Sequence, residues 1–218
     1  MTTSIRILIS DRQGEVSAEI MEPDQMKALM VLAHGAGAGM RHSFMVQLAE
    51  ALAMHRIGSL RYNFLYMENG RKRTDPGAIA EHTVKQVIDK AHELFPNISI
   101  IAGGKSFGGR MTTQFLSKTA LSFVKGIVLF GFPLHPAGEP ATERAAHLYN
   151  IRHPMFFLQG TRDALAQQSL IEKVTSQLPL ATLVQLQGAD HSFKSGKKNL
   201  IPELALETEK WMENKRLF

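Results

Sequence analysis

A serine flanked by glycines lies where a buried strand gives way to a helix. Residues 98–101 form an apolar, β-branched run that predicts a buried strand. Residues 104–108 read G-K-S-F-G, which fits the pattern G-x-S-x-G, and a helix-compatible segment follows them. A sharp turn there would lift the Ser106 hydroxyl clear of the backbone, and glycine at the flanking positions avoids clashes with neighbouring strands. The stretch therefore predicts a nucleophilic serine, although the pentapeptide alone also fits a glycine-rich turn without chemistry.

A phosphate-binding loop is a second interpretation of the same residues, because Gly104, Lys105 and Ser106 read G-K-S. Such a loop requires another glycine five residues before Gly104. That position is Ser99, which lies in the predicted strand. The spacing therefore argues against phosphate binding at this turn.

Two further reactive residues also follow predicted strands. Asp163 comes after the strand expected at 154–160, and His191 comes after the strand expected at 181–186. In a sheet of parallel strands, catalytic residues lie on the loops at the carboxyl ends of the strands. Ser106, Asp163 and His191 are therefore expected to lie close together. An imidazole can take the serine proton, and a carboxylate can hold the imidazole in the required tautomer. The order Ser, Asp, His predicts a catalytic triad.

A serine nucleophile also needs backbone donors for the oxyanion that forms during attack. The N–H of Phe107, directly after Ser106, is one expected donor. The N–H of Ala36 is the other, because residues 34–39 read H-G-A-G-A-G after the strand expected at 28–33. The glycines beside Ala36 would let its peptide approach the substrate oxygen.

Each of these residues has a simpler interpretation when it is taken alone. His34 could shape its turn through a hydrogen bond to a neighbouring loop. Asp163 could cap the segment that begins at Ala164. Asp190 is a rival acid, but its position next to His191 is poorly suited to orienting that ring. The combined order of the residues on successive loops favours the triad.

The elements that must position these residues alternate along the chain. Strands are expected at residues 4–9, 15–21, 28–33, 57–62, 98–101, 124–130, 154–160 and 181–186. Helices are expected near residues 44–52, 76–94, 107–115, 143–149, 170–178 and 202–214. This alternation predicts one α/β domain over residues 1–218, with a mainly parallel sheet, helices on both faces and antiparallel strands at the N-terminal edge.

Composition narrows the function classes. Of 218 residues, 44% are hydrophobic and 21% charged, as in an ordinary globular protein, and no apolar run is long enough to span a membrane. The absence of cysteine excludes a thiol nucleophile and is compatible with the cytoplasm, where we expect the protein. The net charge of +5 favours anionic ligands but is spread along the chain, so no nucleic-acid partner is expected. No cofactor and no metal are expected.

The chain resembles the α/β-hydrolases, and among them a small branch similar to the dienelactone hydrolases. Five motifs carry the resemblance: H-G-A-G-A-G at 34–39, R-x-N-F-x-Y at 61–66, G-K-S-F-G-G-R at 104–110, G-x-R-D at 160–163 and G-x-D-H at 188–191. The resemblance implies that Ser106, Asp163 and His191 are nucleophile, acid and base. Dienelactone hydrolases use cysteine, so their substrate is not implied. The branch also includes a subunit of a chromatin acetyltransferase complex, and the fold alone does not imply turnover.

Five residues are candidates for substrate binding: Arg61, Asn63, Tyr66, Lys105 and Arg110. The basic members would favour a negatively charged substrate, although Lys105 could instead pair with a surface carboxylate, and Arg61 and Arg110 could instead anchor the loops around Ser106. The short connection between 130 and 154 leaves no room for a separate cap domain. We therefore expect an open site formed by residues 35–40, 62–67 and 131–135.

The sequence thus predicts a serine hydrolase that cleaves a carboxylic ester or a related small acyl substrate through an acyl-enzyme intermediate. The alternative is a non-catalytic α/β-hydrolase-fold scaffold or ligand-binding protein that acts through a partner.

Overall fold

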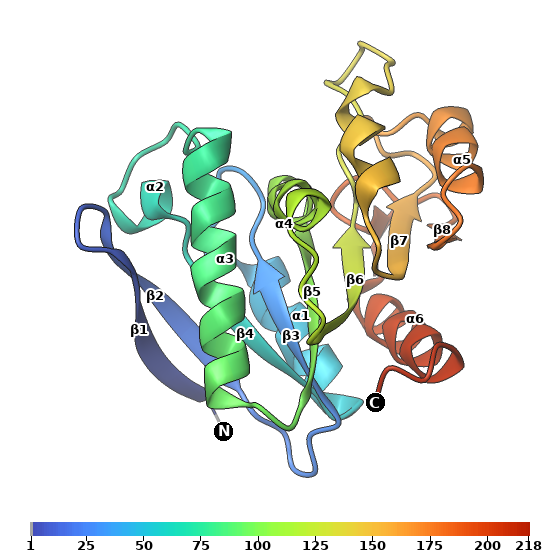
Figure 1. Cartoon of the computed structure of the whole chain (residues 1–218). Coiled ribbons are helices and arrows are strands. Elements are labelled where there is room, and N and C mark those ends of the chain that lie inside the picture. The colour runs from blue at the N-terminus through green and yellow to red at the C-terminus, as the bar shows by residue number, and fades with distance from the viewer. Residues whose placement is uncertain (1) are drawn as a thin grey trace.

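A twisted eight-stranded sheet forms the centre of the molecule in the computed structural model (Figure 1). The structure describes residues 2–218, so Met1, the first residue of the predicted domain, lies outside the described residues. The strands follow the order β1-β2-β4-β3-β5-β6-β7-β8. Their bounds are β1 (Thr2–Ser10), β2 (Gly14–Met21), β3 (Ala28–Ala33), β4 (Ile57–Tyr62), β5 (Ser99–Lys105), β6 (Val124–Phe130), β7 (Met155–Gly160) and β8 (Ala181–Leu186).

The sheet is parallel from β4 to β8 and antiparallel at its N-terminal edge. Strand β1 pairs antiparallel with β2, which pairs antiparallel with β4. Every later pairing is parallel. Strands β3, β4 and β7 are buried along their whole length, as expected for parallel strands covered on both faces. These observations confirm the predicted fold class.

Helices cover both faces of the sheet, and in Figure 1 α3 crosses in front of it while α1 lies behind. The helices are α1 (Ser43–Met54), α2 (Leu65–Glu68), α3 (Gly77–Leu94), α4 (Phe107–Lys118), the 3-10 helix η1 (Glu143–Asn150), α5 (Gln168–Ser176) and α6 (Ile201–Asn214). Alternate residues of β3 enter two separate cores, because successive side chains of a strand point to opposite faces. Leu29 and Val31 pack with α3 and α4, whereas Met30 and Leu32 pack with α1 and α6.

Three small elements were not predicted. Helix α2 has four residues, and the pair β9 (Lys194–Ser195) and β10 (Lys198–Asn199) has two residues per strand. Elements of this length are too short to show a periodic pattern. The segment predicted as a helix near 143–149 is the 3-10 helix η1, which is the one helix between β6 and β7. This connection contains no separate cap domain, as predicted.

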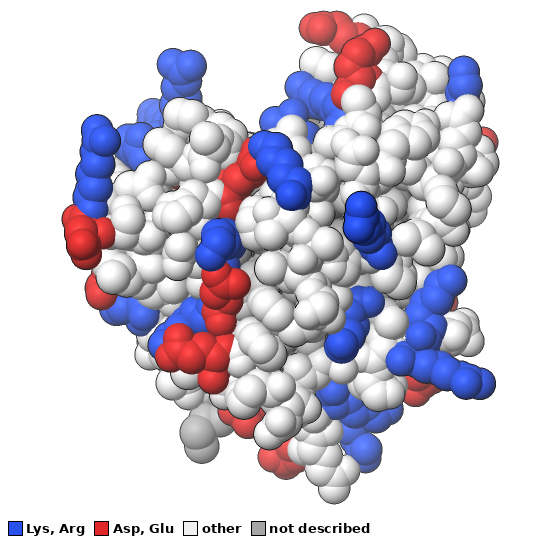
Figure 2. Space-filling view, in the orientation of Figure 1, with Lys and Arg blue, Asp and Glu red and all other residues white. Residues whose placement is uncertain are grey.

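Within residues 2–218, no helix is both long and apolar enough to cross a bilayer. Figure 2 shows one face of the molecule, on which acidic and basic side chains are scattered and most of the surface is uncharged.

Candidate active site

The turn at Ser106 joins β5 to α4 with a strained backbone. Ser106 has φ 51° and ψ −116°, a conformation that residues other than glycine rarely adopt. A Cβ on Gly104 would lie 2.5 Å from the carbonyl oxygen of Ala33, and one on Gly108 would lie 2.6 Å from the same oxygen. Glycine at both positions therefore allows the turn to pack directly against the end of β3. The serine side chain is thereby presented at the carboxyl ends of the parallel strands.

A continuous chain of hydrogen bonds links the three residues predicted as a triad. The Oγ of Ser106 lies 2.9 Å from Nε2 of His191, and Nδ1 of His191 lies 2.6 Å from Oδ2 of Asp163. A proton on Nδ1 satisfies both contacts, because Nδ1–H then donates to the carboxylate and Nε2 accepts from the serine hydroxyl. The arrangement has the connectivity that serine activation requires.

The carboxylate of Asp163 is held by two further donors. Its side chain is fully buried. Nε2 of Gln159 donates to Oδ2 at 2.6 Å, and the N–H of Leu165 donates to Oδ1 at 2.8 Å. Gln159 also accepts the N–H of Phe132 at 2.9 Å, so it ties the ends of β6 and β7 to the acid. Sequence reasoning missed Gln159, although a lone polar residue in the apolar strand β7 is a usable signal.

The rival acid, Asp190, has different partners. Its Oδ1 accepts the N–H groups of Ser192 at 2.8 Å and Lys194 at 3.0 Å, and its side chain is exposed. It forms no hydrogen bond with His191 in the described part of the chain. Asp190 therefore organises the turn after β8, while Asp163 both contacts the imidazole and caps its own turn.

Two backbone N–H groups near Ser106 are free to bind an oxyanion. Phe107 is the first residue of α4, and the helix leaves its N–H without an intrahelical partner. Ala36 is exposed in the loop after β3, and its N–H donates no hydrogen bond within residues 2–218. The loop reaches Ser106, since a Cβ on Gly35 would lie 3.7 Å from the Cβ of that residue.

His34 stabilises this loop through hydrogen bonds of its buried ring. It is fully buried, its Nδ1–H donates to the carbonyl of Gly35 at 2.8 Å, and its Nε2 accepts the N–H of Phe64 at 3.1 Å. Burial lowers the pKa of His34 to about 4. The ring is therefore neutral at physiological pH. These contacts are those of a residue that shapes its turn through hydrogen bonds, which is the simpler interpretation of His34.

A cavity of about 700 Å³ opens beside Ser106. Its lining includes residues 35–38, His42, Phe44, Lys105, Leu165, His191 and Lys194. The expectation for residues 35–40 is thus met in part, but residues 62–67 and 131–135 do not line the cavity. Gly131 lies behind the site instead, where a Cβ would approach both Nζ of Lys105 and the His191 ring within 3.4 Å.

Arg61, one of the predicted substrate-binding residues, does not line the cavity. It is buried on β4, where it lies opposite Glu19 of β2 in the register of the sheet. Its guanidinium donates to Oε2 of Glu19 at 3.0 Å and to the carbonyl of Met40 at 3.1 Å. These contacts join the sheet to the loop after β3 and leave Arg61 away from the cavity.

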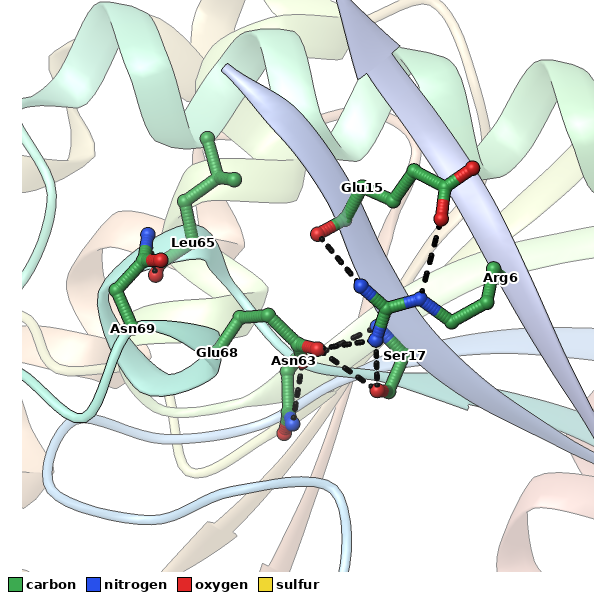
Figure 3. Close-up of polar contacts among 7 residues, drawn as sticks. All are labelled: Arg6, Glu15, Ser17, Asn63, Leu65, Glu68 and Asn69. Carbon is green, nitrogen blue, oxygen red and sulfur yellow. Dashed lines mark hydrogen bonds and ion pairs between the residues drawn. The ribbon is translucent and has the colours of Figure 1, made fainter.

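Asn63 and Tyr66 also support that loop and do not line the cavity. Oδ1 of Asn63 accepts the N–H of Met40 at 3.0 Å, and its Nδ2 donates to Glu68 at 3.1 Å, within the polar cluster that Figure 3 shows. The hydroxyl of Tyr66 donates to the carbonyl of Gly35 at 3.4 Å. Burial raises the pKa of Tyr66 to about 12, so its hydroxyl stays protonated.

Arg110 lies one turn into α4 and is likewise absent from the cavity lining. Burial, and secondarily the positive charge of Arg144, lowers its pKa. Among the candidates for substrate binding, Lys105 is therefore the one that the structure places in the cavity.

Lys105 faces the base of the proposed triad. Its Nζ lies 3.0 Å from Nε2 of His191, and it forms no ion pair with a carboxylate of residues 2–218. The alternative of a surface ion pair is therefore wrong. Burial lowers the pKa of Lys105 to about 7, although the negative charges of Asp163 and Asp190 oppose the shift. No cluster of three or more potential metal ligands occurs in the described chain.

Comparisons with known proteins support the fold. Over 64 residues the chain is 44% identical to a probable cutinase 1 of Aspergillus niger, a match that covers 28% of this chain and 24% of the fungal protein. The chain thus spans about a quarter of the length of that relative. Two solved structures are similar over almost their whole length. The dienelactone hydrolase of Anabaena variabilis has a TM-score of 0.79 at 16% identity, covering 98% of this chain and 97% of its own.

Est1E of Butyrivibrio proteoclasticus has a TM-score of 0.76 at 14% identity, covering 99% of both chains. At these identities the likeness shows the fold alone. A family model described as an alpha/beta hydrolase domain matches residues 26–209. That match covers most of the sequence and includes every residue of the hydrogen-bonded chain described above. The protein belongs to the alpha/beta hydrolase domain family.

Proposed function

We propose that this protein is a serine hydrolase that cleaves esters of small carboxylic acids through an acyl-enzyme intermediate. One observation carries the proposal: the hydrogen-bonded chain from Ser106 through His191 to the buried carboxylate of Asp163. A residue that only shaped the fold would not require this connectivity.

In the first half of the reaction, Oγ of Ser106 attacks the ester carbonyl carbon while Nε2 of His191 accepts the hydroxyl proton. The imidazolium that results is stabilised by its hydrogen bond to the carboxylate of Asp163. The negative charge that develops on the carbonyl oxygen would be bound by the N–H groups of Ala36 and Phe107. Collapse of the tetrahedral intermediate expels the alcohol, which takes the proton from Nε2.

In the second half, a water molecule replaces the alcohol. His191 removes a proton from the water as it attacks the acyl carbonyl carbon, and the second tetrahedral intermediate forms in the same oxyanion site. Its collapse breaks the bond to Oγ, returns the proton to Ser106 and releases the carboxylic acid. The same three side chains therefore serve both half-reactions.

The comparisons favour ester substrates over other acyl compounds. The partial match is to a probable cutinase, and the fold is shared with a dienelactone hydrolase. The scaffold alternative predicts no chemistry at Ser106, and it is therefore separable from the hydrolase by covalent labelling.

A fluorophosphonate probe tests the proposed function, because it reacts only with an activated serine. We expect labelling of the wild-type protein at Ser106, identified by peptide mass spectrometry, and none in Ser106→Ala or His191→Ala. Ser192→Ala is the matched control, since Ser192 lines the same cavity without contacting Nε2. Folded wild-type protein that is not labelled would favour the scaffold and contradict the proposal.

A further inference from the structure

Lys105 and Ser106 compete for a single acceptor. Nζ of Lys105 lies 3.0 Å from Nε2 of His191, and Oγ of Ser106 lies 2.9 Å from the same atom. With the ring proton on Nδ1, Nε2 offers one lone pair. An ammonium that donates to this lone pair therefore competes with the serine hydroxyl for it, which slows proton transfer from the nucleophile.

The surroundings hold the ammonium in this position. Nζ lies 5.9 Å from the ring centroid of Phe44 and 5.5 Å from that of Phe193, within the range at which aromatic faces attract a cation. The two rings are stacked on each other. Gly131 leaves the space that Nζ needs, because a Cβ there would lie 3.1 Å from it. The position of the Lys105 ammonium is thus determined by the two aromatic rings and by the space above Gly131.

The cavity offers Lys105 no counter-charge. The other ionisable side chains that line it are His42, His191 and Lys194, and none of its lining residues is Asp or Glu. Asp163 and Asp190 attract the ammonium from longer range, without forming an ion pair with it. A cavity with two lysines and no carboxylate is suited to an anionic group that arrives with the substrate.

We propose that Lys105 is a gate on His191, which an anionic group of the substrate opens. In the free protein the ammonium donates to Nε2 and occupies its lone pair. A substrate carboxylate in the cavity binds the ammonium through a charge-assisted hydrogen bond. Nε2 is then free to accept the proton of Ser106. This inference rests on the proposed function and makes Lys105 a positioning and specificity residue, while the nucleophile remains Ser106.

The test compares two esters of equal chain length, monomethyl succinate and methyl butyrate, through the release of methanol. The measured quantity is the ratio of kcat/KM for the anionic ester to that for the neutral one, from about pH 6 to about pH 9, where the free carboxyl group is ionised throughout. Both esters require the same base and the same nucleophile, so their contribution to the pH dependence cancels in this ratio.

For the wild type we expect a ratio of roughly 10 to 100 at about pH 6, the effect of one hydrogen bond to a charged group. The ratio should fall as the pH rises through 7, where Lys105 loses its proton. Lys105→Met should hydrolyse the neutral ester faster than the wild type and show a ratio near one at every pH. Lys105→Arg should keep the preference to about pH 9, because a guanidinium stays charged.

Lys194→Met is the matched control, because Lys194 lines the same cavity and forms no hydrogen bond with His191. Its ratio should decrease but keep the wild-type pH dependence. A wild-type ratio of one or less at about pH 6, or a ratio that does not change with pH, would overturn the gate without requiring any variant to fold. If the fluorophosphonate still labels Ser106 in that case, the hydrolase proposal survives; if labelling is also absent, both proposals fail.

Discussion

Two carboxylates lie close to the predicted base, and the atoms they contact separate their roles. Oδ2 of Asp163 lies 2.6 Å from Nδ1 of His191, whereas Oδ1 of Asp190 accepts two backbone N–H groups of its own turn. An acid can orient the imidazole only if it accepts the Nδ1 proton. The geometry therefore favours Asp163.

This assignment predicts unequal effects of two matched substitutions. Asp163→Asn should lower kcat by up to roughly ten-thousand-fold, because an amide can hold the ring in the wrong tautomer. Asp190→Asn should have a small effect, since the amide oxygen can still accept both backbone N–H groups of the turn. Steady-state kinetics on a short ester, with the free energy of unfolding measured alongside, checks the pair. Loss of activity in Asp190→Asn, with full activity in Asp163→Asn, would reverse the assignment.

The turn between β5 and α4 is the element on which the site depends. Gly108 packs against the backbone at the end of β3, and a Cβ there would lie 2.6 Å from carbonyl oxygens of Ala33 and His34. Neither backbone group can move without disturbing the loop after β3. The strained turn and the loop after β3 therefore form one rigid unit.

Gly108→Ala should lower the free energy of unfolding by about 1–3 kcal/mol, the usual cost of overpacking, and should also lower kcat. The control is Gly77→Ala at the start of α3, where the nearest atom to a new Cβ is 3.8 Å away. That variant should be as stable as the wild type or slightly more so. Denaturant unfolding curves measure both, and equal stabilities of the two variants would contradict the packing argument.

The bounds of four of the eight strands could be predicted to the residue from the sequence, whereas the contacts of several side chains could not. The bounds predicted for β3, β4, β6 and β8 are those of the structure. Strand β3 is continuously apolar, as expected for a buried parallel strand, whereas β8 is only half-buried and mixes apolar with polar residues. The loops after β5, β7 and β8 bring Ser106, Asp163 and His191 together because the carboxyl ends of parallel strands lie on the same side of the sheet.

The roles of Arg61 and Gln159 depend on pairings across the sheet. Arg61 meets Glu19 because of the register between β2 and β4, and Gln159 joins Asp163 to the end of β6. The register of these strands is fixed by tertiary packing and is not visible in one sequence. For this reason sequence reasoning left both substrate binding and loop anchoring open for Arg61 and overlooked Gln159.

At the scale of the whole molecule, the connection between β6 and β7 determines how the site meets solvent. It contains the 3-10 helix η1 and no cap domain. The cavity of about 700 Å³ lies at the carboxyl ends of the parallel strands. A cavity of this volume can enclose a small ligand but offers a long acyl chain little apolar wall.

We therefore expect kcat/KM for p-nitrophenyl esters to decrease as the acyl chain lengthens. Without a lid, the rate should also show no abrupt rise when the substrate concentration passes its solubility limit. A series of esters from acetyl to dodecanoyl tests both points. An optimum at the longest chains would contradict the open site.

The most direct test of the account is to trap the acyl-enzyme itself. The protein is mixed with p-nitrophenyl acetate, quenched in acid during turnover, and analysed by mass spectrometry of the intact chain and of its peptides. The account predicts one acetyl group per molecule, located on Ser106, and its absence from Ser106→Ala. Turnover without any acetylated protein, or an acetyl group that accumulates on another residue while Ser106→Ala keeps its activity, would contradict the central claim.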